Sequence, residues 1–470
     1  MLSMPSSIPT LICRLKLFAK LRRPLILSLV ILALVCPLPT VVGAEYTIAE
    51  TVDIDTVPSW FRVGFCLLTE GDQQYAAYYN ETHQMVVAHR QLDQRQWDKV
   101  ILPSKTGWDS HNYITMIIDG DGYIHLTGNM HCVPLIYFRT REPGDISTFE
   151  RLPMTNVEED RCTYPRFMVD SDEQLLFMYR SGQSGNGRSF FNRYDLASQT
   201  WSRFLDTPLF DGQELCNAYP IGPMKGPDGR FHIIWVWRDT PDCATNHDLS
   251  YVRSVDLKHW EAADGTPVSL PLTLNQAEVL IDPVPSGGGI INSGIALTFD
   301  SDNRPLVTYH KRDANDHMQI YVARPENGVW KTHAITHWDK TIAFGGGGSM
   351  PFIGIQASGA QRVAPHTLSV SFRHADYGSG RMLLDEETLQ VVDRTVTIEP
   401  EYPSELRKPQ IEFSGIEVQL ARDIGELPDA PVRYLLKWET LGSNRDRPRD
   451  PPLPPASMLK LVKLVKTTSE

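Results

Sequence analysis

One pattern recurs along the chain and limits the folds open to it: an apolar strand, an acidic or glycine turn, and a second apolar strand. It occurs in MIIDGDGYIHLTG, FMVDSDEQLLFMYR, GPDGRFHIIWVWR and LTFDSDNRPLVTYHK. The turn aspartates, spaced 51, 58 and 72 residues apart, are Asp119, Asp170, Asp228 and Asp300. Repeats of this length with several strands in each are typical of a β-propeller.

A further strand with a Trp or acidic turn follows most of these hairpins, as in FFNRYDLASQTW and LSYVRSVDLKHW. Counting gives about six such units between Cys66 and Ile398. The apolar stretches 46–54 and 433–438 would complete another unit by joining the two ends of the chain. We therefore predict an all-β, single-domain, seven-bladed β-propeller over residues 45–440.

The two ends of the sequence differ in composition from the rest. Basic residues end at Arg22-Arg23, an apolar run covers 24–37, and Val42-Gly43-Ala44 ends in the small residue that signal cleavage requires. A lipoprotein signal at Cys36 is the alternative. We expect residues 1–44 to be a signal peptide and the product to be secreted or periplasmic, with no membrane partner. The Pro-rich and basic residues 441–470 are predicted to be a disordered tail.

The charge of the chain excludes one class of partner. The net charge is -12, and residues 1–44 hold five basic residues and no acidic one, so the remaining chain is more acidic still. Nucleic-acid binding is therefore not expected. A polyanionic substrate would need a locally basic cleft.

Five cysteines follow residue 44, too few and too scattered for a disulfide scaffold, although one or two bridges remain open. Cys243 and His247 lie four apart, with Cys216 upstream, so a structural zinc site is one reading and a loop with a buried thiol is the other. A structural calcium ion is also left open. We expect no cofactor or catalytic metal.

The stretch from Trp108 to Arg139 contains the clearest candidate site. Asp119-Gly120-Asp121-Gly122 predicts a turn between strands at 113–118 and 123–127. His111 precedes the first strand and His131 follows the second. An antiparallel hairpin brings these two positions together, so we expect the imidazoles to be neighbours.

Further polar residues occupy similar points of successive repeats, where the blades of a propeller converge on its axis. We predict that they line one cleft with the histidine pair: Asn112, Tyr179, Arg180, Arg193, Tyr194, Arg238, Asn246, His247, His310 and Arg312. Each could alternatively be an ordinary polar strand end. A set rich in His, Tyr and Arg suits β-elimination from a uronic acid, which needs a cation, a base and an acid. Glycosidases usually need two carboxylates, and Asp109 and Asp239 have no evident partner.

Three segments resemble a known family: DSHNYITMIIDGDGYIHLTGNMHCVPLIYFR, MYRSGQSGNG and WRDTPDCATNHDLSYVRS. They are similar to the BNR-repeat-containing proteins that include seven-bladed propeller ulvan lyases. The resemblance implies elimination at a uronate joined to sulfated rhamnose. It also implies catalytic roles for His111, His131, Tyr179 and Arg193, with Arg238 competing for the last.

The expected function is thus that of a secreted polysaccharide lyase, a monomer whose partner is an anionic polysaccharide. The substrate-binding residues are predicted to be Asn112, Arg180, Arg238, Asn246, His247 and His310. Two alternatives stay open. One is a glycosidase or exo-lyase acting on rhamnosyl-glucuronate linkages with the same fold, and the other is a non-catalytic carbohydrate-binding propeller.

Overall fold

The computed structural model describes residues 45–398, 400–426 and 430–467, so the predicted signal peptide lies outside the described residues. All described residues fall within one compact unit, Gly43–Glu470. They form seven antiparallel sheets, and their helical segments are short 3₁₀ turns: η1 (Ile146–Thr148), η2 (Cys243–Thr245), η3 (Ala277–Val279), η4 (Asn292–Gly294) and η5 (Ser404–Arg407). No described helix has the length and apolar character needed to cross a bilayer.

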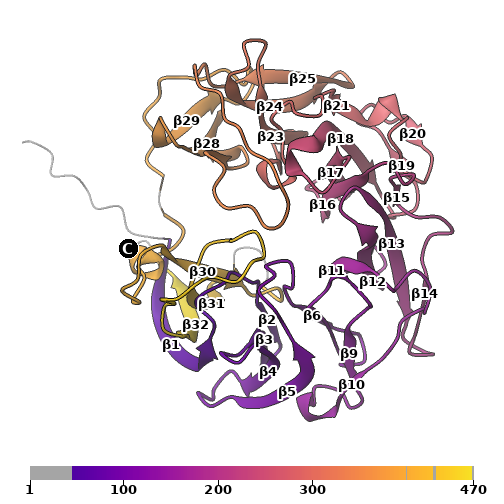
Figure 1. The fold of residues 1–470 in the computed structure, drawn as a ribbon, viewed down its shortest axis with the longest axis vertical. Coiled ribbons are helices and arrows are strands. Elements are labelled where there is room, and N and C mark those ends of the chain that lie inside the picture. Colours follow the sequence, from indigo (N-terminus) through magenta and orange to yellow (C-terminus); the bar gives the residue numbers. More distant parts are fainter. Residues whose placement is uncertain (1–44, 399, 427–429, 468–470) are drawn as a thin grey trace, which may run out of the picture. The chain divides into compact units, whose positions relative to one another are not determined.

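The sheets follow the chain in order (Figure 1). The first three are built from consecutive segments: β2 (Cys66–Glu70), β3 (Gln73–Tyr79), β4 (Gln84–Gln91) and β5 (Asp98–Lys105); β6 (Thr115–Ile118), β7 (Ile124–Thr127), β9 (Tyr137–Thr140) and β10 (Phe149–Arg151); and β8 (His131–Val133), β11 (Cys162–Val169), β12 (Leu175–Gln183), β13 (Asn186–Asp195), β14 (Thr200–Arg203) and β15 (Phe210–Asp211). Because β8 pairs with β11, the chain crosses to the next sheet directly after the β6–β7 hairpin.

The next three sheets continue this order: β16 (Asn217–Lys225), β17 (Phe231–Arg238), β18 (Asn246–Ser254), β19 (Trp260–Glu261), β20 (Pro267–Val268) and β21 (Leu280–Asp282); β22 (Ala296–Phe299), β23 (Pro305–Arg312), β24 (Met318–Glu326) and β25 (Val329–Ala334); and β26 (Ile355–Ala357), β27 (Gln361–Ala364), β28 (Thr367–His374) and β29 (Gly378–Asp385). Apolar side chains of successive sheets pack together. Phe210, for example, lies against Trp235 and Trp237.

The recurring aspartates are turn residues, as predicted. The Asp119 carboxylate accepts hydrogen bonds from the backbone N–H groups of Asp121 and Tyr123. Asp170 and Asp300 do the same in the turns that follow β11 and β22, and Asp228, after β16, accepts from the backbone N–H of Arg230. An aspartate that satisfies backbone donors two residues ahead stabilises a tight turn, which explains its recurrence in the repeats.

The seventh sheet joins the two ends of the described chain. Its strand order is β1 (Tyr46–Val57), β32 (Ser457–Lys466), β31 (Val432–Leu441) and β30 (Ile416–Arg422). β1 and β31 cover the two stretches that were expected to join the ends of the chain, and they lie in one sheet with β32 between them.

The prediction of a disordered tail after residue 440 is wrong. β32 is a central strand, with β1 on one side and β31 on the other. Leu459, Leu461 and Leu464 are fully buried, while Lys460 and Lys463 are half-buried. Leu459 and Leu461 pack into one apolar cluster and Val462 and Leu464 into another, as expected for a central strand with both faces covered, although the sequence by itself resembles a basic amphipathic tail.

Candidate active site

The two histidines that flank the β6–β7 hairpin lie side by side. The ring centroids of His111 and His131 are 4.1 Å apart. Antiparallel pairing of β6 with β7 accounts for this, because it brings the chain before Thr115 next to the chain after Thr127. The predicted proximity of the two imidazoles is confirmed.

One carboxylate connects the two rings. Nδ1 of His111 lies 2.8 Å from Oδ1 of Asp109, and Nδ1 of His131 lies 2.5 Å from Oδ2. When each Nδ1 donates its hydrogen to Asp109, each Nε2 is left to face a ligand. Within the described residues neither Nε2 has a hydrogen-bond partner.

A second carboxylate comes from the connection between β31 and β32. Oδ2 of Asp446 lies 3.2 Å from Nδ1 of His111. This carboxylate also accepts hydrogen bonds from the backbone N–H groups of Ser110 and Ser349. The segment predicted to be disordered therefore supplies one wall of the site.

These carboxylates set the charge of His111. Burial opposes a charged imidazole, but the hydrogen bonds and charges of Asp109 and Asp446 outweigh burial and raise the pKa of His111 from 6.5 to about 9. Burial likewise opposes ionisation of Asp109, and its hydrogen bonds with both histidines outweigh that and lower its pKa. At neutral pH His111 is therefore an imidazolium beside two ionised carboxylates.

Changing Asp446 to Asn is expected to lower the pKa of His111, because one of its two negative partners is lost. The folded-state pKa of His111 lies above its ordinary value, so its ion pairs stabilise the fold fully below about pH 6.5 and are lost as the pH rises through about 9. In the Asp446→Asn variant, His111 should lose its proton, and with it this stabilisation, at a lower pH than in the parent. Titration of the His111 ring by NMR measures the change directly.

Asp450→Asn provides the matched control, since Asp450 lies in the same connection and is exposed. It should leave the titration of His111 unchanged. An Asp446→Asn protein in which His111 titrates as in the parent would contradict the assigned role of Asp446.

A tyrosine and an arginine adjoin the histidine pair. The rings of His111 and Tyr164 meet edge to face, with centroids 5.8 Å apart. The Arg180 guanidinium lies 4.9 Å from the centre of the Tyr164 ring. Its Nη2 donates to Oγ1 of Thr163, whereas its buried Nη1 and Nε have no partner in the described part of the chain. Tyr164 has φ of +58° at a bulge of β11, a conformation that is rare for an aromatic residue and typical of functional sites.

A second tyrosine–arginine pair continues this arrangement. The rings of Tyr164 and Tyr219 are 6.1 Å apart, and the Arg238 guanidinium lies 5.1 Å from the Tyr219 ring. Burial raises the pKa of Tyr164, and the charges of Arg180 and Arg238 only partly oppose this. Tyr164 therefore keeps its proton at neutral pH and is available as a donor.

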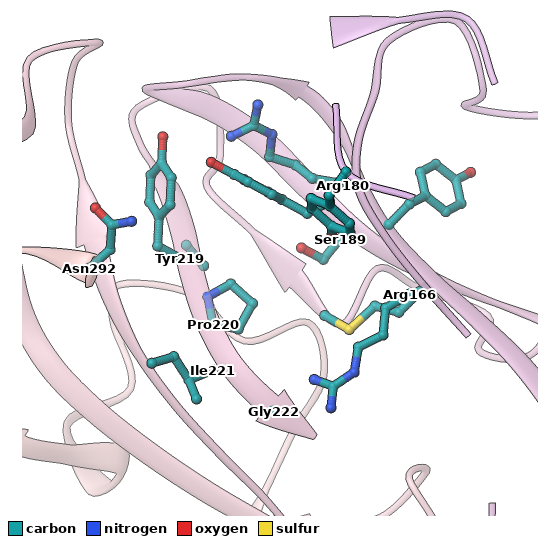
Figure 2. Close-up of a pocket in the computed structure, with 13 residues that line it drawn as sticks. Arg166, Arg180, Ser189, Tyr219, Pro220, Ile221, Gly222 and Asn292 are labelled. Carbon is teal, nitrogen blue, oxygen red and sulfur yellow. The ribbon is translucent and has the colours of Figure 1, made fainter. Parts of the chain in front are cut away.

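Tyr164, Arg180 and Tyr219 line a cavity of about 280 Å³ (Figure 2). Figure 2 shows the guanidinium groups of Arg180 and Arg166 at opposite ends of the lining, with Pro220 and Ile221 along one side of it. No Asp or Glu lines the cavity among the described residues. In a chain with 57 acidic and 45 basic residues, such a cavity favours an anionic ligand.

The sequence matches the family model described as BNR repeat-containing family member over residues 73–338, more than half of the chain. The chain belongs to this BNR repeat-containing family. One relative of this chain is the ulvan lyase short isoform of Alteromonas sp. (strain LOR). The two sequences are 26% identical over 211 residues, and the alignment covers 38% of this chain and 39% of the relative. The chain thus spans about two fifths of that relative's length.

Two solved structures share the fold of this BNR repeat-containing protein. The polysaccharide lyase Uly1 superposes with a TM-score of 0.58 at 14% identity, covering 89% of this chain and 99% of Uly1. A PL25 ulvan lyase bound to -[GlcA(1-4)Rha3S]- has a TM-score of 0.52 at 14% identity, with 88% of this chain and 94% of that chain covered. At such identities the likeness establishes the fold alone.

Tyr179 contributes to the lining of the cavity, but its hydroxyl is bonded to groups other than the histidine pair, so its catalytic role stays a prediction from the sequence. This side chain is buried in the core of its sheet against Phe177 and Phe190. Its hydroxyl accepts from the Arg203 guanidinium and donates to the Val157 carbonyl. Neighbouring residues of a strand point to opposite faces, so Arg180 reaches the histidine side and Tyr179 does not.

Arg193 is also placed away from the histidine pair. It is opposite Leu176 at the start of β12, four residues before Arg180, which corresponds to roughly 13 Å along the strand. Arg180, assigned to substrate binding from the sequence, takes the position expected for Arg193. A register count from the turn between Gln183 and Asn186 would have signalled this, because it pairs Arg193 with Leu176.

The remaining predicted binding residues have partners of their own. Asn112 is buried below His111 and donates to Oγ1 of Thr106, and Asn246 donates to the Cys243 carbonyl. His310 is buried and faces the Gly289 carbonyl, and burial lowers its pKa to about 4.

Arg238 remains at the site through its contact with Tyr219. Two further predicted cleft residues serve other contacts: Tyr194 accepts from Arg139 and Arg312 pairs with Asp316.

The zinc hypothesis at Cys216, Cys243 and His247 is not supported. Across the described residues these three do not form a group of possible ligands, and the five described cysteines are free thiols. Both ring nitrogens of His247 face carboxylates, those of Asp239 and Asp248. The one group with suitable spacing in this part of the chain consists of the active-site residues Asp109, His111, His131 and Asp446.

Proposed function

We propose that this protein is a secreted polysaccharide lyase that cleaves an ulvan-type, uronate-containing polysaccharide by β-elimination. The observation that carries the proposal is the imidazole pair fixed by Asp109 beside a cavity that arginine and tyrosine side chains line, with no acidic side chain among the described lining residues. The ulvan lyase relative and the oligosaccharide-bound structure of the same fold support the choice of substrate.

The cations of the site would hold the uronate carboxylate. Removal of the proton beside a carboxylate creates negative charge, which a guanidinium fork and an imidazolium stabilise. Arg180 has unpartnered donors, and His111 is charged at neutral pH. These two residues therefore neutralise the substrate.

The charge of His111 decides which histidine acts as the base. His111 already carries its proton, so His131 acts as the base, with its Nδ1 hydrogen donated to Asp109 and its Nε2 directed at the substrate. His131 takes the proton from the carbon beside the carboxylate, and the electron pair forms the new carbon–carbon double bond. The bond to the leaving oxygen breaks as Tyr164 donates its proton to that oxygen.

The other expectations complete this proposal. The seven sheets would be the blades of a single-domain, seven-bladed β-propeller closed by the sheet of β1, β30, β31 and β32. Residues 1–44 would act as a signal peptide, and the product would work outside the cytoplasm as a monomer. The reaction as written uses only side chains, so it requires no metal or cofactor.

The test is incubation of the purified protein with ulvan and with a panel of other uronate polysaccharides, followed by ultraviolet absorbance of the unsaturated product. We expect absorbance to increase with ulvan and not with polymers that lack a uronate. New reducing ends without ultraviolet absorbance would show hydrolysis and would contradict the proposal. Binding without either product would indicate a carbohydrate-binding protein.

Hydrolysis is disfavoured by the state of the two carboxylates. Asp109 and Asp446 both lie against His111, and Asp109 is also bonded to His131. A glycosidase needs one carboxyl group that is protonated and one that reaches water or the sugar. Since the pKa values of both groups are lowered by their histidine partners, neither is a suitable acid.

A further inference from the structure

Arg166 is a charged residue at the cavity that the proposed reaction does not use. It lies on β11 opposite Met178 of β12, at the end of the cavity away from Arg180 in Figure 2. Its guanidinium has no hydrogen bond or ion pair with any described residue. The residue is exposed although it contributes to the cavity lining, and an arginine remains charged at every relevant pH.

The local backbone directs this side chain to the cavity. β11 has a bulge between Thr163 and Arg166, and both Tyr164 and Arg166 line the cavity. The Tyr113 hydroxyl donates to the Pro165 carbonyl and fixes the bulge from the neighbouring sheet. The fixed backbone sets the position from which the Arg166 side chain reaches the cavity, where its guanidinium has donors available for an anion.

Part of the cavity lining is apolar and suits a sugar ring. Met178, Pro220 and Ile221 contribute to it. A ligand that pairs with both guanidinium groups and packs against the apolar lining carries one negative charge near Arg180 and another near Arg166. The part of the ligand between these charges is less polar.

We propose that Arg166 binds a sulfate ester on the sugar next to the uronate whose carboxylate is held by Arg180. The inference rests on the proposed function for the identity of the first charge. A sulfate ester fits the second position because a guanidinium presents paired donors to a planar or tetrahedral oxyanion. Arg166 thereby determines specificity for sulfated substrate without taking part in proton transfer.

The test compares Arg166→Gln with the parent on native ulvan and on chemically desulfated ulvan. For native ulvan we expect KM to rise about 10- to 100-fold with kcat nearly unchanged, the usual effect of losing a hydrogen bond to a charged group. For the desulfated polymer, parent and variant should have the same KM. Arg381→Gln, an exposed strand arginine outside this cavity, is the matched control and should behave as the parent.

A binding measurement separates this inference from the proposed function. Calorimetric titration of both polymers into proteins that carry His131→Ala, with and without Arg166→Gln, needs no turnover. Weaker binding of the sulfated polymer alone supports the sulfate subsite, even if the parent fails to release unsaturated product. Equal weakening for both polymers, no change for either, or no binding to the parent overturns it.

Discussion

Replacing Tyr164 with Phe is expected to lower kcat on ulvan roughly 10²- to 10⁴-fold, the usual contribution of one general acid. The substitution removes a hydroxyl that has no partner in the described part of the chain, so it breaks no contact that supports the fold. The remaining ring keeps its place against His111 and beneath Arg180. The rate of increase in ultraviolet absorbance measures the effect, and thermal unfolding verifies that the variant is folded.

Tyr179→Phe is the matched control, since it removes the same atom from a tyrosine fifteen residues away. Here the hydroxyl is bonded to Arg203 and Val157, so stability should fall by about 1 kcal/mol while kcat stays near the parent value. The reverse result, with Tyr179→Phe inactive and Tyr164→Phe active, would return the acid role to the residue favoured by the sequence.

Replacing His131 with Ala is expected to lower the rate by a similar roughly 10²- to 10⁴-fold, because the base is lost. The variant leaves a space beside Asp109, so added imidazole should restore part of the activity. Restoration of this kind depends on proton transfer and would not occur if His131 merely supported the fold.

His259→Ala serves as the control for this change. His259 is also paired with an aspartate, Asp256 at 2.7 Å, but its side chain is 86% exposed on another sheet. Its removal should leave the rate unaltered, with or without imidazole. A His131→Ala protein that folds and releases unsaturated product at the parent rate would show that another group is the base.

The parts of the site predicted from sequence are those determined by local chain geometry. The Asp-Gly turn specifies the β6–β7 hairpin, and the hairpin alone brings His111 to His131. The turn aspartates of the repeats are likewise predictable. The hairpin and these turns each depend on residues within a few positions of one another, which a single sequence displays directly.

The missed residues depend on distant contacts or irregular backbone. Asp446 meets His111 only because β32 inserts between β1 and β31, and no local pattern records that closure. Tyr164 reaches the site through a bulge with positive φ, which breaks the simple alternation of strand faces. Alignment to the resembling family favoured Tyr179, one residue from Arg180 but on the opposite face of its strand.

The position of Asp446 depends on the sheet that both ends of the described chain share. The connection that carries Asp446 is anchored by β31 and β32, and β32 is held to β1 by hydrogen bonds rather than by a covalent link. Separation of β1 from β32 would release this connection and remove a negative partner from the His111 imidazolium. Partial unfolding between β1 and β32 would therefore abolish the proposed lyase activity while the other sheets are still formed, so that loss of activity would precede global unfolding.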